Sequence, residues 1–496
     1  MKNRVNCWKP SIVVVAVMVI SSQAAGSAHG TAEGSETRPV SSASNTLAHE
    51  RPTPHVGEDI VRHPDESLGL AQTVSATVVR NTTYKMQHIR LWRAIPKLAA
   101  YNTVEEYNLI TSYGENPDSG FIDEGDLPEE DDSTYERKFS VVKYLGTVRR
   151  VTHVMSLVRP AHGNVIAQET VSGTMHLLRV VERALFYGDS SLSALQFDGY
   201  EKLMLDLAPA TNIIDLRGQP LTEDVLIDAA LTAHDAPNYG QITHMHLNPK
   251  VKADLVKTFF PKERYNLFSD GKSNNGMIGL DIGGWTSPAG DVRFESNTFI
   301  TDGGAPTSAV GDAAKRPAAI TESTALAAAP DAGSLFAAAD AGDYTYAVQP
   351  VNRYGRGAAL SPAGGAVTVA AGDGVTIGVT PSGTPYPDWY ELYRSQPDGT
   401  ALRRIARVPN TLAGAETVLT DLNERLPFTT SGFCFQQNLE SMSFKQLAPM
   451  VKIPLATIDS SIRWMQLLYG VPVLYTPGKN VLLINIGRQT DYVGAP

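Results

Sequence analysis

The chain has 496 residues, 42% hydrophobic and 19% charged, so it is long enough for about three domains and can bury real cores. Its net charge of −10 excludes a general nucleic-acid-coating protein, which would carry a basic excess. The two cysteines, Cys7 and Cys434, exclude a disulfide-stapled scaffold and a cysteine-rich zinc site. No interior apolar run reaches ~18 residues, so we expect no membrane span in the body of the chain.

The start of the chain has the features of a leader rather than of a packed fold. Basic residues precede an apolar run at 12–20 and small residues follow it, which is the pattern of a secretory signal peptide. Residues 29–70 are polar and almost free of aromatic side chains, so they cannot bury enough area to become ordered. We predict a flexible leader over 1–70 that is either a signal-like segment or a propeptide.

An arm and a hairpin are predicted next. Residues 71–120 mix apolar and aromatic residues without a clean period, as in an extended arm with short helical pieces. The acidic stretch 123–132 lacks the ligand spacing of a calcium loop and is interpreted as a solvated loop. Strand-like runs at 138–145 and 147–158 flank Gly146, which predicts a long hairpin that projects as a ribbon.

The clearest helix is predicted over 169–187, where apolar residues recur every three or four positions from Val171 to Leu185. Gly188 then stands where a C-terminal cap belongs. Further elements are expected as a helix over 223–233, a strand over 241–247, and a helix that starts at Pro249 with Asn248 as N-cap. Because helices and strands alternate irregularly, the pattern favours an α+β fold over a doubly wound sheet.

A separate all-β unit is predicted in the second half of the chain. Residues 311–343 are crowded with Ala, Gly, Asp and Pro, as in a linker. Short strand-like runs follow at 344–351, 366–369, 375–380, 389–395 and 403–408, and 422–430 closes the unit. Mixed apolar segments return at 462–469 and 481–486, so the unit is predicted to be a sandwich inserted into another fold.

Several features could carry chemistry, but each has a structural explanation. They are the pair His244 and His246, the turn Gly188-Asp189-Ser190-Ser191, the glycine pairs at 283–284 and 303–304, and Cys434. The two imidazoles would face one side of a strand, yet no third ligand has a matching spacing, so a packed or surface pair is predicted. Trp389 and Tyr390 are interpreted as core. We therefore predict no catalytic, cofactor-binding or metal site, and no enzyme.

The order of these segments resembles that of tailed-bacteriophage major capsid proteins with the HK97-like fold, in particular their SU10-type branch. The residues that carry the resemblance are 102–105 through Asp126 with 135–138 near the extended loop, 169–189 as spine helix, 246–255 as strand–helix junction, 290–299 as strand pair, and 464–470, 477–480 and 484–487 near the C-terminus. The likeness covers about 71–310 and 429–496 and consists of diffuse patterns rather than one motif.

The resemblance implies a domain organisation. It comprises an N-terminal arm over 71–120, an extended-loop hairpin over 121–165, a spine helix with the P domain and the first part of the A domain over 166–310, and the C-terminal part of the A and P domains over 429–496. The insert, 311–428, resembles an immunoglobulin or fibronectin type III sandwich, and such insertions commonly decorate the outer capsid surface in this family.

The resemblance also implies a function. A major capsid protein assembles with itself into hexamers and pentamers of an icosahedral shell around double-stranded DNA. It is a virion protein assembled in the host cytoplasm, with scaffold, portal and maturation protease as further partners. No cofactor, no sequence-specific nucleic-acid binding and no membrane in the mature form are implied.

The leader departs from this family, and three explanations remain open. It could be a propeptide cleaved after Glu50 in Ala48-His49-Glu50, a signal peptide, or the product of a start codon placed too far upstream. Two other function classes stay in competition. One is a secreted cell-surface binding protein with a fibronectin-like module, and the other is an exported hydrolase that uses the histidine pair.

Overall fold

The computed structural model describes residues 84–114, 121–158 without 126, 128, 129 and 131, 164–263, 282–411, 413–456 and 459–489. The predicted leader over 1–70, with Glu50, therefore lies outside the described residues. No helix within these ranges is both long enough and apolar enough to cross a membrane.

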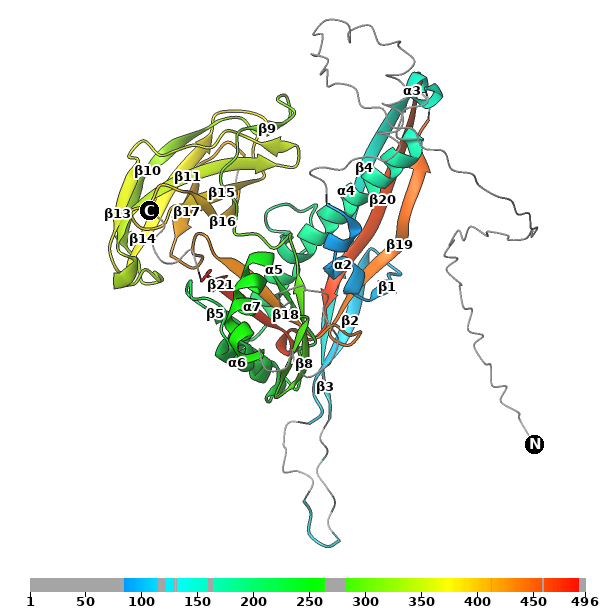
Figure 1. Ribbon diagram of the computed structural model, residues 1–496, viewed down its shortest axis with the longest axis vertical. Helices are drawn as coiled ribbons and strands as arrows, with labels where there is room; N and C mark the ends of the chain where they lie inside the picture. The colour runs from blue at the N-terminus through cyan, green and yellow to red at the C-terminus, as the bar shows by residue number, and fades with distance from the viewer. Residues whose placement is uncertain are drawn as a thin grey trace, which may run out of the picture. The chain divides into compact units, whose positions relative to one another are not determined.

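A four-stranded sheet carries the long helix α4 (Val165–Tyr187) (Figure 1). Its strands lie in the order β1 (Lys97–Ala99), β19 (Met442–Pro454), β20 (Ser461–Leu474) and β4 (Lys143–Thr152). β4 runs antiparallel to β20, with Thr152 opposite Ser461 and Lys143 opposite Gly470. Because α4 packs on β4, the helix and the sheet form two packed layers. The sheet also places β1 of the arm beside the C-terminal strand β19.

Helix α4 confirms the predicted helix and begins four residues earlier. The Oδ1 of Asn164 accepts hydrogen bonds from the backbone N–H groups of Ile166 (2.9 Å) and Ala167 (3.3 Å), which makes it the N-cap. The helix ends at Gly188, as predicted. A Cβ at Gly188 would lie 2.4 Å from the carbonyl oxygen of Phe197, so the close approach of the following loop requires glycine there.

The buried stripe of α4 agrees with the predicted pattern only in its second half. Leu178, Val181 and Leu185 are buried, whereas Val171 is 47% exposed. Near Val171 the helix meets β20 through polar groups, because the Nε2 of Gln466 donates to the carbonyl of Thr170 at 3.0 Å. The helical spacing of apolar residues therefore begins at Val171, but apolar packing of the helix is seen only further along it.

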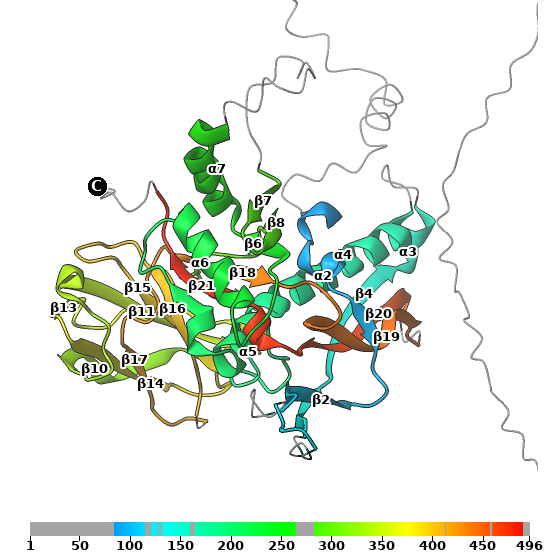
Figure 2. The ribbon, with the colours of Figure 1, turned by 90° about the horizontal axis from the view of Figure 1, so that it is seen from below.

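A mixed six-stranded sheet forms the second layer pair. Its strands lie in the order β5 (Ile213–Asp215), β21 (Val481–Ile486), β18 (Thr430–Phe435), β6 (His244–Leu247), β8 (Gly290–Ser296) and β7 (Gly284–Ser287). It is covered by the helices α5 (Tyr200–Leu207), α6 (Glu223–His234) and α7 (Pro249–Glu263), of which α6 contacts β21 and α7 contacts β8 (Figure 2). These elements confirm the predicted helices and the α+β class. Parallel pairs (β5–β21, β6–β8) stand beside antiparallel ones, as an irregular order of elements requires.

One hydrophobic core joins the two sheets. Val181 and Phe186 of α4 pack with Phe433 of β18, Phe444 of β19 and Leu468 of β20, all of them buried. The short helix α2 (Leu91–Ala94) of the arm packs against α4, and η1 (Met86–His88) precedes it without a buried residue; both correspond to the predicted short helical pieces. The remaining short helices are α3 (His153–Leu157), η2 (Ala210–Asn212), η4 (Ala338–Asp340) and η5 (Pro477–Lys479).

The predicted hairpin around Gly146 is wrong. Strand β3 (Thr134–Val141) pairs with β2 (Val104–Ser112), not with β4, and the two-stranded ribbon therefore spans the predicted boundary between 71–120 and 121–165. Gly146 lies inside β4, where a Cβ would stand 2.6 Å from the Cδ2 of Leu467. The glycine thus permits close packing of β4 on β20 rather than a turn.

The second half of the chain holds an all-β unit of two sheets, as predicted. One sheet has the order β10 (Ile320–Pro330), β14 (Asp373–Pro381), β17 (Thr417–Asp421), and the other β16 (Arg403–Pro409), β15 (Trp389–Arg394), β11 (Gly342–Asn352), β12 (Gly355–Arg356), β9 (Val310–Gly311), with β13 (Ala366–Val369) beside β11. Tyr344, Tyr390 and Leu419 lie in its own core. Its likeness to immunoglobulin or fibronectin type III domains and the domain boundaries stay predictions.

Two details of that unit differ from expectation. The predicted linker 311–343 contains β10, which pairs with β14 in place of forming a coil. The alanines of β10 have little apolar bulk, and its outer positions are exposed, so its pattern is that of an edge strand. The predicted closing strand 422–430 is a loop, and Thr430 already begins β18 of the six-stranded sheet.

Candidate assembly interface

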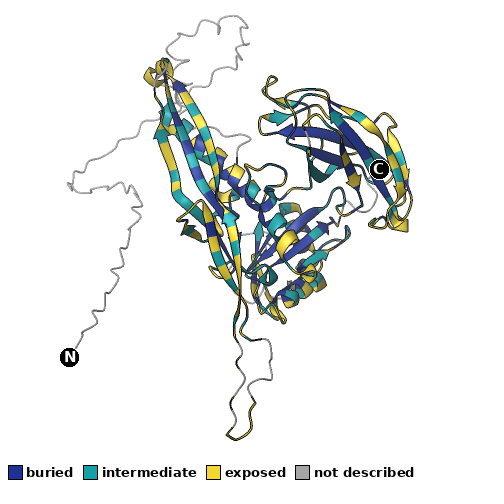
Figure 3. Cartoon of the chain, turned by 180° about the vertical axis from the view of Figure 1, so that it is seen from behind, coloured by how far each residue is buried: buried dark blue, intermediate teal, exposed yellow. Residues whose placement is uncertain are grey.

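The β2–β3 ribbon exposes large apolar side chains, and no third strand joins it among the described residues. Ile110 is 51% exposed, Tyr135 63% and Phe139 72%, while Tyr113 and Phe121, beyond the strand ends, are 86% and 91% exposed. Figure 3 shows exposed residues along this ribbon. A two-stranded ribbon is marginally stable in water by itself, because neither face is covered. A surface from another molecule would cover these side chains.

The base of the ribbon is anchored on the body. The carboxylate of Glu105 accepts hydrogen bonds from the backbone N–H groups of Tyr101 (2.6 Å) and Asn102 (3.0 Å) and pairs with Lys445 of β19 at 3.3 Å. Burial opposes the ionisation of Glu105, but these donors outweigh it and lower its pKa. The anchored base sets the direction of the ribbon and leaves its outer part uncovered.

A second apolar surface lies where β4 runs into α3 (Figure 1). We call it the distal patch, and its members are Val148 (61% exposed), Val154 (68%), Met155 (43%), Leu157 (71%) and Val158 (52%). Contiguous exposed apolar side chains of this kind mark interaction sites in soluble proteins. The chain therefore presents two separate surfaces that are suited to protein–protein contact.

A buried carboxylate attaches the N-terminal arm to α4. Glu182 is fully buried and accepts hydrogen bonds from the backbone N–H groups of Arg90 (3.0 Å), Leu91 (2.8 Å) and Trp92 (2.8 Å), and from the side-chain amide of Asn297 (2.6 Å). It thus satisfies the free N–H groups at the start of α2. Burial raises the pKa of Glu182, and the four donors oppose that shift.

The histidine pair does not form a metal site with other described residues. His246 is fully buried, and its ring lies against Phe186 and Phe435 at centroid distances of 6.0 and 5.9 Å, while His244 is half-buried. No group of three or more His, Cys, Asp or Glu side chains suited to a metal ion occurs in the part of the chain that the structure describes. Of the packed or surface pair that the sequence predicts, His246 is packed in the core and His244 is half-buried.

Burial keeps His246 neutral. The Nε2 of His246 lies 2.6 Å from the amide nitrogen of Gln437, which can only donate, so the ring proton is assigned to Nδ1. Burial, followed by the charges of His244 and Arg90, lowers the pKa of His246 from 6.5 to about 3.

We expect the folded subunit to lose stability as the pH falls. An unfolded chain binds a proton at His246 below pH ~6.5, whereas the folded chain binds it only near the depressed pKa of about 3, so stability is full above that window and declines through it. At pH 5 this linkage removes ~2 kcal/mol. Urea unfolding of unassembled subunits at pH 8 and pH 5 measures it. His246→Phe should reduce the difference in unfolding free energy between pH 8 and pH 5, whereas His153→Gln, at an exposed position, should preserve it. An equal difference in both variants would contradict the role of His246.

The other chemical candidates are also structural. The Oδ1 of Asp189 accepts hydrogen bonds from the backbone N–H (2.9 Å) and the hydroxyl (2.6 Å) of Ser191, which makes the segment a turn after α4. Gly303 and Gly304 have φ values of 86° and 68°, as turn glycines do. Cys434 is fully buried, and burial raises the pKa of its thiol, which disfavours a reactive thiolate at this residue.

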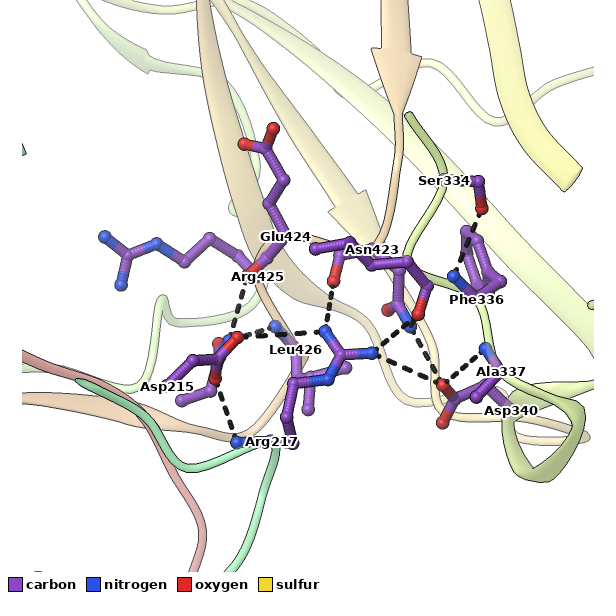
Figure 4. A network of polar contacts seen from close by, with 12 residues as sticks. Asp215, Arg217, Ser334, Phe336, Ala337, Asp340, Asn423, Glu424, Arg425 and Leu426 are labelled. Carbon is purple, nitrogen blue, oxygen red and sulfur yellow. Dashed lines mark hydrogen bonds and ion pairs between the residues drawn. The ribbon is translucent and has the colours of Figure 1, made fainter. Parts of the chain in front are cut away.

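Arg217 connects the six-stranded sheet to the inserted unit (Figure 4). Its guanidinium donates to the carbonyls of Asn423 (2.8 Å) and Leu335 (2.7 Å) and lies 3.5 Å from the carboxylate of Asp340. Its backbone N–H donates to Asp215 at 2.9 Å. Arg217 has a φ of 49°, which is uncommon for a non-glycine residue and shows that these contacts hold it in place.

Arg217→Ala is expected to loosen the inserted unit without unfolding the body. It removes two hydrogen bonds to carbonyl oxygens and the ion pairs with Asp340 (3.5 Å) and Asp215 (3.9 Å), a loss of about 2 kcal/mol at this junction. Limited proteolysis should then cut the segment around Asn423 several times faster than in the unaltered chain. Arg316→Ala, on the same unit, serves as control. Equal cleavage rates in both variants would show that Arg217 does not secure the junction.

Sequence reasoning missed Glu182 and Arg217. Glu182 left a signal, because it is the one carboxylate next to Val181 and Leu185 on the apolar stripe of the helix. Arg217 left none, since its acceptors are backbone carbonyls distant in sequence. The sequence predicts the β2 residues as arm and the β3 residues as part of the hairpin around Gly146, because more than twenty residues separate the two paired strands.

No protein-family model matches the chain. The chain is 25% identical over 418 residues to the major capsid protein of Staphylococcus phage K, which covers 82% of this chain and 87% of that protein. It is 24% identical over 474 residues to the putative major capsid protein of Enterococcus phage phiEF24C, which covers 88% and 96%.

Solved structures align along most of the chain, although with low global scores. A chain from the solved structure of Gordonia phage Cozz aligns at a TM-score of 0.43 and 10% identity, covering 88% of this chain and 98% of that one. The capsid of phage XM1 aligns at 0.40 and 8%, covering 82% and 95%. The relationship itself follows from the sequence matches above. The predicted resemblance to the major capsid proteins of bacteriophages is confirmed: the α+β chain is similar in sequence, over more than four fifths of its length, to proteins named as major capsid proteins of phages.

Proposed function

We propose that this chain is the major capsid protein of a tailed phage and assembles with itself into an icosahedral shell around double-stranded DNA. The observation that carries the proposal is the β2–β3 ribbon, where Tyr135 and Phe139 lie exposed on a pair of strands that no third described strand joins. If each subunit covers the ribbon of its neighbour, the exposed side chains of every ribbon are buried in the same way, so the proposed partner is another copy of the chain. Relatives that align along more than four fifths of the chain and are named major capsid proteins support this choice of partner.

The arrangement of copies follows from symmetry. A ribbon that lies on a different surface of its neighbour makes a head-to-tail contact, and contacts of this kind close into rings. We propose hexamers and pentamers, with the distal patch as a further contact between copies. The net charge of −10 suits a container in which packaged DNA must stay mobile, because a basic lining would bind phosphates. Portal, scaffold and maturation protease are proposed partners, and the place of the protein is the virion.

The role is structural rather than enzymatic. Capsid relatives support that reading, and the full burial of His246 argues against an exported hydrolase that would use it. The interpretation as a secreted binding protein finds no support among the relatives. For the leader we propose proteolytic removal after Glu50, in which case the first residue of the mature subunit is Arg51.

Expression of the full chain followed by sedimentation velocity and negative-stain microscopy tests the assembly. Closed shells, or rings of five and six copies, are the expected products. A folded monomer that stays monomeric at high concentration would exclude the proposed function. Intact-mass measurement of subunits from shells tests the leader: a chain that starts at Arg51 supports the propeptide, and one that starts just after Ala28 supports a signal peptide.

A further inference from the structure

A cleft lined with arginines lies between α4 and the inserted unit. Its volume is about 420 Å³, within the range of ligand sites in proteins. α4 contributes two of the arginines, and β12 and β16 contribute three, as follows: Arg179, Arg183, Arg356, Arg404 and Arg407. Five guanidinium groups on one cleft are unusual in a chain that carries a net charge of −10.

The positive charge of this cleft is only partly balanced. Glu391 is the one carboxylate among the described residues that line it, and it pairs with Arg356 at 2.8 Å and with Arg404 at 3.0 Å. Arg179 and Arg183 form no salt bridge with any described residue, and Arg407 does not either. The carboxylate of Glu201, in the adjoining pocket, is already paired with Arg425 at 2.8 Å.

The surroundings of these arginines favour an added anion. Partial desolvation, followed by repulsion from Arg404 and Arg356, lowers the pKa of Arg183, although a guanidinium stays protonated in proteins. The indole N–H of Trp389, on the same cleft, has no hydrogen-bond acceptor among the described residues. Carboxylates or phosphates placed here would relieve the repulsion and accept charge-assisted hydrogen bonds.

The chain itself contains an anion of matching character. In the segment 123–132, between β2 and β3, seven of ten residues are acidic and none is basic. Cover for the exposed ribbon by a second copy, as proposed above, brings this segment onto that copy. We propose that the arginine cleft is the docking site for the acidic segment 123–132 of a neighbouring copy, an inference that rests on the proposed self-assembly.

Binding of a synthetic peptide that spans residues 121–134 tests this docking. Fluorescence anisotropy is measured with the full chain, kept below the concentration at which it assembles. Binding is expected at low ionic strength and should weaken about tenfold or more between 0.05 and 0.5 M salt. Arg179→Glu with Arg183→Glu should weaken it by a similar factor or more. Arg93→Glu with Lys250→Glu changes the net charge equally away from the cleft and should leave binding nearly unchanged.

Several outcomes would overturn the docking. The peptide could fail to bind, or a peptide with every Asp and Glu replaced by Asn and Gln could bind equally well. The two double variants could also weaken peptide binding by the same factor. If binding of a short DNA duplex depends on Arg179 and Arg183 and binding of the peptide does not, the cleft is a nucleic-acid site instead. Because the assay reads single subunits, it is independent of shell formation. Cleft-dependent binding without shells would contradict the proposed function alone, and shells without peptide binding would contradict the docking alone.

Discussion

Tyr135→Asp together with Phe139→Asp is expected to abolish shell formation and to leave the subunit folded. Both side chains lie on β3 and are 63% and 72% exposed, so aspartate at these positions remains hydrated in the isolated subunit. Covered by a neighbouring copy, each aspartate would become a desolvated charge without a partner, at a cost of several kcal/mol. The cost recurs at every contact of the shell, and the expected result is a monomer or small oligomer.

Sedimentation velocity and negative-stain microscopy measure the loss of shells, and far-UV circular dichroism and thermal unfolding check the fold. Val418→Asp is the matched control, because Val418 is 52% exposed on β17, a strand of the inserted unit that contributes no residue to the arginine cleft or to the ribbon. Shells of normal size from the Tyr135/Phe139 double variant would show that the ribbon is not an interface.

Glu182→Leu is expected to detach the N-terminal arm or to unfold the subunit. The substitution removes the acceptor of three backbone N–H groups and of the Asn297 amide, all inside a buried site. A buried donor without an acceptor costs ~1–3 kcal/mol, so a loss of ~4 kcal/mol or more is expected, a large part of the stability of a typical domain. Proteolysis of residues 84–95 should become rapid at the same time.

Glu182→Gln separates charge from hydrogen bonding. The Oε1 of Glu182 accepts from Arg90, Leu91 and Asn297, which an amide oxygen can still do, but the amide nitrogen would then face the N–H of Trp92. We expect about half the loss of the leucine variant in urea unfolding. Glu169→Gln, on the exposed part of α4 and 3.5 Å from Arg149, should change stability by less than ~1 kcal/mol. If the Glu182→Leu variant is as stable as the unaltered chain, Glu182 does not attach the N-terminal arm to α4.

The mistaken hairpin shows where local pattern fails. A glycine between two β-branched runs is a common turn signal, and Gly146 fits it. The competing interaction is long-range: β20, more than 300 residues later, offers β4 a continuous antiparallel partner, and Gly146 is the position where Leu467 needs room. Strand pairing is decided by the side chains of both strands, and a single strand carries only half of that information.

The alanine-rich linker has a related explanation. Alanine, glycine and aspartate have low strand propensity, so 311–343 matches a coil by composition. β10 nevertheless forms, because β14 supplies hydrogen bonds along its length and Ile320 enters the core of the inserted unit. The backbone hydrogen bonds to β14 and the burial of Ile320 outweigh the low strand propensity of this sequence.

Features that depend on near neighbours were specified by the sequence. Helix α4 with its glycine end, α6, α7 with Asn248 before it, and most strands of the inserted unit follow from period, caps and turns within a few residues. The tertiary structure alone decided which strands pair, that Glu182 holds the arm, and that arginines from α4 and the inserted unit meet in one cleft. Most of these relations join residues that are far apart in the chain, such as Leu91 with Glu182 and Thr152 with Ser461, and no local pattern encodes them, because their energy arises only when both partners are in place.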